Sequence, residues 1–304
     1  MTHRRAPGGR LALIAALVVL LVSVAVATAL VGRGAGVPSP LPADPFVGSA
    51  HPVLVGAGDI ADCQLDADSR TADLLDVISG TVFTAGDNAY QSGSLSEYER
   101  CYGPTWGRHR ARTRPAVGNH EYLTEAALGY RAYWGDAAGA RGQFWYSFDL
   151  GAWHVIVLDS NCTIIACGPG SPQLDWLRAD LAESDALCTA AIWHHPRFTS
   201  GEHGDATDTA PLWDELEAAG ADLVLSGHDH DYERFAPIDG MRGFVVGTGG
   251  AALRRFPRIH EGSEARNDTT HGVLALRLRP DAYDWSFVPV AGGLFTDQGS
   301  DVCR

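Results

Sequence analysis

The sequence predicts a mixed α/β domain in which a sheet with helical crossovers joins a second, more antiparallel sheet. Short apolar segments typical of buried strands alternate with segments of helical periodicity, and the last two strand candidates follow one another without a helix. The 35 glycines and 16 prolines indicate many tight loops between short elements. These observations argue against a helical bundle.

The predicted strands share short runs of aliphatic and aromatic residues. They cover residues 53–57, 81–85, 153–158, 190–193, 222–226, 244–247, 273–278 and 283–288. The predicted helices cover residues 70–78, 172–182 and 211–219. In the second helix Leu174, Leu177 and Leu181 fall on one face, as expected for a helix that packs against a sheet.

The N-terminal segment predicts export. Basic residues precede an uninterrupted run of apolar and small residues from Leu11 to Val31, which ends with alanines spaced as in a signal-peptidase site. About 20 apolar residues also suffice to span a bilayer. Residues 1–31 are therefore predicted to be a cleavable signal peptide or an uncleaved membrane anchor, and residues 32–50 a linker rich in Gly, Pro and Ser. Either way, residues 51–304 form one domain outside the cytoplasm, secreted or anchored.

Charge and cysteine content narrow the class of protein. The chain has 37 acidic and 23 basic side chains, a formal charge of -14, which argues against nucleic acid as a partner. An acidic protein that binds an anionic ligand must supply positive charge locally, and metal ions do so.

Six cysteines outside the cytoplasm predict three disulfides, and the short spacing favours Cys162 with Cys167. The first two and the last two cysteines can then pair. A thiolate zinc site is less favoured, because no C-x-x-C pair occurs.

Polar residues that can bind a metal occur where the predicted strands end. In chain order they are Asp59, Asp87, Asn119 with His120, His194, and His228 with His230. Ligands bind beyond the carboxyl ends of strands in open α/β sheets, so we expect these side chains to converge. An Asp after a strand also commonly begins a turn, and Tyr90 alone would be an ordinary loop aromatic. Only the joint occurrence of all these residues indicates a metal site.

Oxygen and imidazole donors without sulfur suit zinc, iron or manganese. These residues supply more donors than one ion can use, which predicts two ions with a bridging carboxylate. Several of the donors directly follow a glycine, as needed where the backbone turns sharply or packs close to a ligand.

Five short motifs occur in order: Gly-Asp at 58–59, Gly-Asp-Asn-Ala-Tyr at 86–90, Gly-Asn-His-Glu at 118–121, His-His-Pro at 194–196 and Gly-His-Asp-His at 227–230. Together they resemble the calcineurin-like metallophosphoesterases. The tyrosine three residues after Asp87 and the run Gly-His-Asp-His-Asp-Tyr-Glu-Arg at 227–234 resemble the purple acid phosphatase branch. The resemblance implies a metallophosphatase-type four-layer α/β/β/α sandwich with two mixed sheets, formed by residues 51–304.

The resemblance also implies roles for individual residues. One metal would be held by Asp59, Asp87, Tyr90 and His230, and the other by Asp87, Asn119, His194 and His228. Asp87 would bridge them. A phenolate ligand favours Fe(III) at the first position, with divalent Fe, Zn or Mn at the second. His120 would lie beside the scissile ester, where it can bind a phosphate oxygen or protonate the leaving group while a metal-bound hydroxide attacks phosphorus.

Some positions leave alternatives open. Many superfamily members have a metal-binding histidine two positions after the first aspartate, but this chain has Ala61 there, with Asp62 beside it as an additional or outer group. Either His194 or His195 can be the ligand, and the spacing to Pro196 favours His194. The other ring would then be structural, or weakly substrate-binding. A loop histidine, His203, can reach a phosphate or simply be exposed.

The sequence as a whole predicts a phosphomonoesterase of acid phosphatase type that acts on a small phosphorylated substrate. A phosphodiesterase with the same metal pair, or an exported metal- or phosphate-binding protein without turnover, remain alternatives. Membrane contact is expected only through the N-terminal segment, and the sequence does not predict an oligomeric state. An aromatic cluster is interpreted as packing around the loops that frame the site, with substrate contact as the less favoured alternative: Tyr130, Tyr133, Trp134, Phe144, Trp145 and Tyr146.

Overall fold

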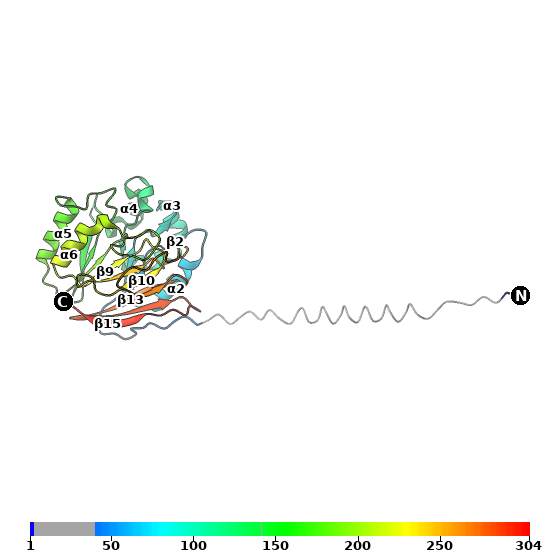
Figure 1. Ribbon diagram of the computed structural model, residues 1–304. Coiled ribbons are helices and arrows are strands. Elements are labelled where there is room, and N and C mark those ends of the chain that lie inside the picture. Colours follow the sequence, from blue (N-terminus) through cyan, green and yellow to red (C-terminus); the bar gives the residue numbers. More distant parts are fainter. Residues whose placement is uncertain (3–39, 141) are drawn as a thin grey trace. The chain divides into compact units, whose positions relative to one another are not determined.

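The computed structural model of the protein describes residues 1–2, 40–140 and 142–304, of which residues 41–304 form one compact unit (Figure 1). The predicted signal peptide or anchor at 1–31 lies almost wholly outside the described residues, as does the first part of the predicted linker. Across the ranges that are described, no helix is long and apolar enough to cross a membrane. The last part of the predicted linker, from residue 41, belongs to this compact unit: Phe46 packs against its core, and the Arg277 guanidinium lies 5.1 Å from the Phe46 ring centre.

The first sheet has six strands in the order β15-β14-β13-β1-β3-β5. Their bounds are β1 Val53–Ala57, β3 Thr81–Ala85, β5 Thr113–Ala116, β13 Gly272–Arg279, β14 Ala282–Pro289 and β15 Gln298–Val302. Strands β1, β3 and β5 run parallel, whereas β13, β14 and β15 pair antiparallel. The carboxyl ends of the three parallel strands therefore lie at one edge of this sheet.

The second sheet has seven strands in the order β12-β10-β11-β9-β8-β7-β6. Their bounds are β6 Tyr146–Leu150, β7 Trp153–Val157, β8 Cys188–Ile192, β9 Leu223–Ser226, β10 Tyr232–Phe235, β11 Arg242–Val246 and β12 Ser263–Asn267. Strands β7, β8, β9 and β11 are parallel, and the other three pair antiparallel. A short ladder joins β2 (Ala61–Asp62) to β4 (Ala89–Tyr90) beside the first sheet.

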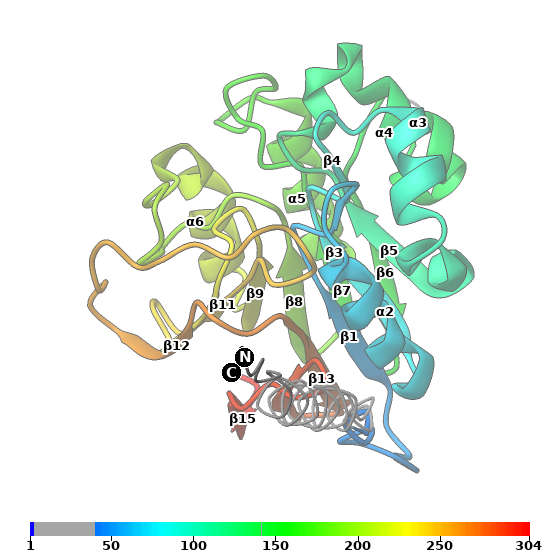
Figure 2. The same cartoon turned by 90° about the vertical axis from the view of Figure 1, so that its right-hand side faces the viewer.

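Helices cover the outer faces of the two sheets, with α2 on one side and α5 and α6 on the other (Figure 2). The α-helices are α2 Ala67–Val77, α3 Leu95–Glu97, α4 Leu128–Trp134, α5 Pro172–Glu183 and α6 Ala210–Ala218. A π-helical turn spans Tyr98–Tyr102. The 3-10 helices span Trp106–Arg112, Glu121–Leu123, Glu125–Ala127, Gly135–Ala138 and Thr207–Thr209. Helix α5 begins where the Ser171 hydroxyl accepts the Leu174 N–H at 3.3 Å and Pro172 takes the first helical position, a favourable start for a helix.

Successive side chains along the central strands of the second sheet point to opposite faces of that sheet, so the interior has two cores. In β7, Val155 and Val157 face the core between the sheets, whereas Ile156 packs with α5 and α6. In β9, Leu225 faces the inter-sheet core and Val224 the helices. A strand that is apolar on both faces must be covered on both, which produces the α/β/β/α layering.

Three disulfides cross-link the chain, including the Cys162–Cys167 bond that the cysteine spacing favoured. They join Cys63 to Cys101, Cys162 to Cys167, and Cys188 to Cys303. The last bond fixes β15 and the C-terminus to the start of β8, which belongs to the other sheet. Among the described residues no cysteine is free.

The predicted two-sheet sandwich is confirmed. Strands β1 and β3 have the predicted bounds. Helix α2 begins at Ala67 rather than Arg70, and α3 and α4 were not predicted. Five strands of the large sheets were not predicted, namely β5, β6, β10, β12 and β15. Among these, β5 reads Thr-Arg-Pro-Ala and β12 reads Ser-Glu-Ala-Arg-Asn, so neither has an apolar strand pattern.

Candidate metal centre

The loops at the carboxyl ends of the parallel strands of both sheets meet and are hydrogen bonded to one another. The Asp59 N–H donates to the Gly86 carbonyl at 3.1 Å, which joins the loops after β1 and β3. The Gly227 N–H donates to the His194 carbonyl at 3.0 Å, which joins the loops after β8 and β9. The Gly58 N–H reaches the carbonyl of Val246, at the end of β11, at 2.8 Å. The polar side chains at these strand ends are therefore brought to one place.

Three of these residues have left-handed backbone conformations that L side chains rarely adopt. The φ angles are 58° at Asp59, 49° at Asp87 and 71° at His228. Such conformations cost about 1–3 kcal/mol each and persist where surrounding structure imposes them, as at functional sites. Here they turn each side chain toward the same point beyond the strand ends.

Two glycines allow the loops to pack this closely. A Cβ atom on Gly118 would lie 2.1 Å from the Asp87 Oδ1 atom, and one on Gly86 would lie 2.5 Å from the His194 Nδ1 atom. Gly86 also has a φ of +83°, which only glycine adopts freely. A larger residue at either position would displace a carboxylate or an imidazole of the cluster.

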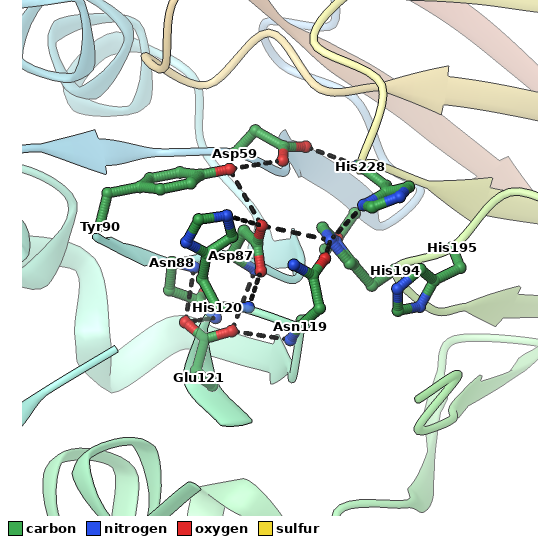
Figure 3. A network of polar contacts seen from close by, with 12 residues as sticks. Asp59, Asp87, Asn88, Tyr90, Asn119, His120, Glu121, His194, His195 and His228 are labelled. Carbon is green, nitrogen blue, oxygen red and sulfur yellow. Dashed lines mark hydrogen bonds and ion pairs between the residues drawn. The ribbon is translucent and has the colours of Figure 1, made fainter. Parts of the chain in front are cut away.

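The first group of donor atoms surrounds the Tyr90 hydroxyl. It lies 2.8 Å from Asp59 Oδ1 and 3.0 Å from Asp87 Oδ2 (Figure 3). His230 Nε2 is 3.2 Å from the same hydroxyl. His230 Nε2 is also 3.4 Å from Asp59 Oδ1. Two carboxylate oxygens, one phenol oxygen and one imidazole nitrogen therefore face one another.

The second group surrounds His194 Nε2. This atom lies 2.9 Å from Asn119 Oδ1, 3.2 Å from His228 Nδ1 and 3.3 Å from Asp87 Oδ2 (Figure 3). Asp87 Oδ2 thus belongs to both groups. The structure brings together all seven side chains that the sequence analysis named as metal ligands.

Backbone contacts aim both carboxylates. One oxygen of Asp59 accepts the His228 N–H at 2.8 Å, and one oxygen of Asp87 accepts the His120 N–H at 2.9 Å. In each case the second oxygen is the one that faces the other donors. The loops therefore fix the direction of both carboxylates.

Backbone carbonyls orient two of the imidazoles in the same way. His194 Nδ1 donates to the Ala85 carbonyl at 2.8 Å, and His230 Nδ1 donates to the Ala252 carbonyl at 2.9 Å. These bonds leave each Nε2 directed into the cluster. Metal-binding histidines are commonly held by such a hydrogen bond on the ring nitrogen that does not bind the metal.

The donor set fits metal ions. Bonds of about 2 Å from a metal to its ligands place neighbouring donors about 3 Å apart, as observed in both groups. With Nδ1 donating to the Ala85 carbonyl, His194 Nε2 faces two oxygen atoms that carry lone pairs, Asn119 Oδ1 and Asp87 Oδ2. Either a metal ion or a proton must therefore lie between these atoms. Burial lowers the pKa of His194, but the charge of Asp87 outweighs it and raises the pKa to about 10. The carboxylates of Asp59 and Asp87 are buried and need a positive charge beside them. Without a metal, a proton on His194 must supply that positive charge.

The phenol of Tyr90 leads to the same conclusion. Burial, followed by the charges of Asp59 and Asp87, raises the pKa of Tyr90 well above its usual value. The phenol therefore keeps its proton unless a cation lies beside its oxygen. For His228, burial and the neighbouring His194 and His195 lower the pKa, which keeps this imidazole neutral and able to coordinate.

Glu121 supports the cluster from below, a role that the sequence analysis did not assign. Its buried carboxylate accepts the N–H groups of Asp87 at 3.1 Å, Asn88 at 2.8 Å and Gly118 at 2.7 Å (Figure 3). It also accepts the Tyr98 hydroxyl at 2.9 Å. Burial and the charge of Asp87 raise its pKa. One carboxylate thus joins the loops after β3 and β5, and its place in Gly-Asn-His-Glu was the available signal.

His120 lies at the margin of the cluster. Its Nδ1 donates to the Gln91 carbonyl at 2.6 Å, and its Nε2 lies 3.7 Å from Asp87 Oδ2. The ring is partly exposed and packs edge-on against Tyr90, with ring centres 4.5 Å apart. His120 therefore presents Nε2 to a ligand that binds over Asp87.

His195 lies to the side of His194 and has different partners (Figure 3). Its Nδ1 is 2.9 Å from the Ser160 hydroxyl, which also accepts the N–H groups of His194 and His195. Burial and the charge of His194 lower the pKa of His195 to about 3. Its nitrogen atoms come within 4.8 Å of those of His194 and His228, but it belongs to neither donor group.

His203 is held above the cluster rather than free in its loop. Its Nδ1 lies 2.8 Å from Asp229 Oδ1, and its ring covers that of His228 with centres 4.1 Å apart. Arg254, which the sequence analysis did not single out, places Nη1 3.0 Å from His203 Nε2. No short motif marks Arg254, which is brought there by the loop after β11.

The region around Ala61 contains no replacement for the absent histidine. Ala61 is buried in the short β2–β4 ladder, next to Ala89. The two Asp62 oxygens contact the Gln64 N–H at 2.9 Å and the Gln91 side-chain amide at 3.1 Å, so this carboxylate is turned to the loop surface. Tyr90 fills the first donor group instead.

A family model described as calcineurin-like phosphoesterase matches residues 52–232, which include all five motifs. The chain belongs to the calcineurin-like phosphoesterase family. Probable purple acid phosphatase 20 of Arabidopsis thaliana is 32% identical over 109 residues, 33% of this chain and 25% of that protein. Acid phosphatase A of Cryphonectria parasitica is 32% identical over 124 residues, 33% of this chain and 24% of that protein. The chain thus spans about a quarter of the length of these curated relatives.

The fold is shared with a solved purple acid phosphatase structure. The structure of purple acid phosphatase PPD1 from yellow lupin (Lupinus luteus) seeds superposes with a TM-score of 0.70 at 20% identity, covering 86% of this chain and 55% of that one. At this identity the likeness shows the fold alone. The match to probable purple acid phosphatase 20 confirms the predicted resemblance to the purple acid phosphatase branch.

Proposed function

We propose that this member of the calcineurin-like phosphoesterase family hydrolyses small phosphomonoesters at a centre of two metal ions, as an acid phosphatase does. The observation that supports this most directly is the position of Asp87 Oδ2, which belongs to both donor groups at distances of 3.0 and 3.3 Å. A carboxylate shared in this way is the arrangement that holds two ions close together for phosphate ester chemistry.

The two donor groups differ in chemistry, and so would their metals. We propose Fe(III) for the group that contains Tyr90, because a phenolate is a hard anionic ligand. Divalent Fe, Zn or Mn is proposed for the group of Asp87, Asn119, His194 and His228. Two bound metal ions would supply Lewis-acid chemistry, which polarises a water molecule and neutralises phosphate oxygens.

His120 is the proposed proton donor to the leaving group. Because Nδ1 donates to the Gln91 carbonyl, Nε2 is the atom left to face the ester. In its protonated form Nε2 can bind a phosphate oxygen or give a proton to the departing alkoxide. The packing of His120 against Tyr90 holds the ring in this orientation.

Arg254 is proposed to bind the phosphoryl oxygens from the opposite side, with His203 holding its guanidinium in place. Asp229 fixes His203 through both its ring Nδ1 at 2.8 Å and its backbone N–H at 3.0 Å. Arg254 adds a permanent positive charge beside this ring in a chain of net charge -14. An acidic protein thereby keeps positive charge where an anionic substrate must bind.

An extracytoplasmic location is proposed for the domain. Three disulfides are typical of oxidising compartments and rare in the cytosol. They agree with the export signal expected at residues 1–31, which is proposed to leave the protein secreted or tethered to the membrane.

Hydrolysis of 4-nitrophenyl phosphate and of bis(4-nitrophenyl) phosphate, before and after treatment with a chelator, tests the proposal. We expect faster hydrolysis of the monoester, loss of activity on chelation, and recovery when iron and zinc are restored. Asp62→Asn is the matched control, because this carboxylate lies next to the cluster but faces the loop surface. A preference for the diester would favour the phosphodiesterase. Metal binding without hydrolysis of either ester would favour a binding protein.

A further inference from the structure

A second feature beside the metal centre is a cavity of about 640 Å³ that the proposed chemistry does not use. It is lined mainly by apolar and aromatic side chains. They include Tyr122, Leu128, Phe144, Trp145 and Ile164. Of the aromatic cluster singled out in the sequence, Phe144 and Trp145 line this cavity. Packing was the favoured interpretation there and substrate contact the alternative, yet Trp145 is only partly buried and Leu128 and Ile164 are exposed.

Two residues in the walls of the cavity belong to loops that carry donors of the metal centre or are hydrogen bonded to them. On one side Tyr122 comes two residues after His120, and its N–H donates to the Asn119 carbonyl at 3.1 Å. On the other side Asp159 precedes Ser160, whose hydroxyl accepts the His194 N–H at 3.1 Å. Both walls therefore continue directly into loops that carry donors of the second group.

A disulfide shapes the outer wall. The bond between Cys162 and Cys167 closes a short loop that presents Ile164 to the cavity. The Asn161 carbonyl accepts the Ile164 N–H at 2.8 Å, and the Asn161 side-chain amide reaches the Gly118 carbonyl at 3.4 Å. The loop is thus tied to the segment that carries Asn119 and His120, and it keeps an exposed apolar side chain in place.

The charged groups of the wall are already engaged by other groups. The Asp159 carboxylate accepts the Tyr122 hydroxyl and the Asn161 amide groups. The Arg131 guanidinium donates to the carbonyls of four residues, Gly135, Gly139, Ala140 and Gln143. Among the described residues that line the cavity, neither charged group is left for an anion. The lining therefore suits an apolar group rather than a second phosphate.

We propose that this cavity binds the apolar, aromatic part of the substrate, so that the enzyme prefers aryl phosphates to small polar phosphate esters. The inference rests on the proposed phosphomonoesterase function and adds the substrate class. The phosphoryl group lies at the metal donors, and the ring of the leaving group packs against Tyr122, Phe144, Leu128 and Ile164. Aromatic rings in an apolar, partly enclosed wall favour such a group through burial and through edge-to-face contacts.

Kinetics with 1-naphthyl phosphate and glycerol 2-phosphate test the proposal. Leu128→Asp and Ile164→Asp place a charge in the wall at side chains that are 58% and 57% exposed, so the fold should tolerate them. We expect KM for 1-naphthyl phosphate to rise about tenfold and KM for glycerol 2-phosphate to change less than about twofold. Leu187→Asp is the matched control, because Leu187 is 59% exposed but lines a different cavity. Equal changes for both substrates, or none, would overturn the proposal.

A binding measurement separates this inference from the proposed activity. Calorimetric titration of the full-length, metal-loaded protein with phenylphosphonate and methylphosphonate requires no turnover. We expect phenylphosphonate to bind about tenfold more tightly, and Ile164→Asp to abolish this difference. Failure of hydrolysis with the difference retained would contradict the phosphatase but support the cavity. Equal binding of both phosphonates by the unaltered protein would sink the cavity proposal.

Discussion

Asp87 connects the two donor groups to each other and to the loops that surround them. Its Oδ2 belongs to both donor groups, its Oδ1 accepts the His120 N–H, and its own N–H is held by Glu121. Burial alone would raise the pKa of Asp87, but the charge of His194 and then His120 lowers it overall. The carboxylate therefore stays ionised although it is buried, which suits it to hold cations.

At the residue scale the first prediction concerns His120. In His120→Ala the proposed proton donor is lost, and we expect kcat for 4-nitrophenyl phosphate to fall by about 10²–10⁴-fold. Metal content should stay unchanged, because His120 belongs to neither donor group. Steady-state kinetics with metal analysis of the same samples checks this, and His51→Ala, an exposed histidine, serves as control. Normal hydrolysis by a metal-loaded His120→Ala would remove His120 from the mechanism.

At the scale of elements, Glu121 joins the loops after β3 and β5 through three backbone N–H groups. In Glu121→Gln an amide N–H₂ group would face some of these donors. We therefore expect the free energy of unfolding to fall by about 2–3 kcal/mol, and metal to bind more weakly.

Urea unfolding measures the stability of Glu121→Gln, and competition with a chelator measures its metal affinity. Glu125→Gln, in the next 3-10 turn and exposed, is the matched control and should change neither quantity. If Glu121→Gln behaved like this control, the carboxylate would not be what joins the two loops.

A second prediction at this scale concerns His154 on β7. It lies between Asp149 at 3.1 Å and Asp180 of α5 at 2.8 Å, and these carboxylates raise its pKa despite burial. A raised pKa in the folded state stabilises the protein at pH below about 6.5, and this contribution disappears as the pH rises through the folded-state pKa.

We therefore expect His154→Gln to lower the free energy of unfolding by about 1 kcal/mol more at pH 5.5 than at pH 9. Asp149 is largely exposed, which keeps the effect small. Urea denaturation at the two pH values measures the difference, with His51→Gln as control. A loss that is the same at both pH values would show that the protonated imidazole is not stabilising the contact between β7 and α5.

The sequence predicted those elements and residues whose signal is local. Strands β1 and β3 are buried apolar runs with the predicted bounds, and each predicted donor lies within one of the five motifs. Strand β5 was missed because Arg114 and Pro115 disrupt its pattern, and it is a strand only because it pairs with β3. Arg254 was missed for a related reason, since its contact with His203 joins loops that are 51 residues apart.

At the scale of the whole molecule, disulfides connect distant parts of the fold. The bond between Cys188 and Cys303 closes a separation of 115 residues, whereas that between Cys162 and Cys167 closes only 5. A longer closed loop restricts the unfolded chain more. We expect replacement of Cys188 and Cys303 by serine to lower the free energy of unfolding by about 4–5 kcal/mol, against about 2 kcal/mol for the short loop.

Guanidinium unfolding of the two double-serine variants provides this comparison. The short-loop variant is the control for the long-loop variant, because both exchange two cysteines for serines and both lose one disulfide. Equal destabilisation by the two would mean that loop length does not govern the effect. A larger effect of the short loop would mean that the Cys162–Cys167 loop contributes native contacts of its own.

The central claim is that two metal ions share Asp87, and metal content measures it most directly. Elemental analysis of the purified protein, after reconstitution with iron and zinc, should give about two equivalents per chain. Asp87→Asn should hold less than about one, while Asp62→Asn should hold as much as the unaltered protein. Two equivalents retained by Asp87→Asn, or no bound metal in the unaltered protein, would contradict the account.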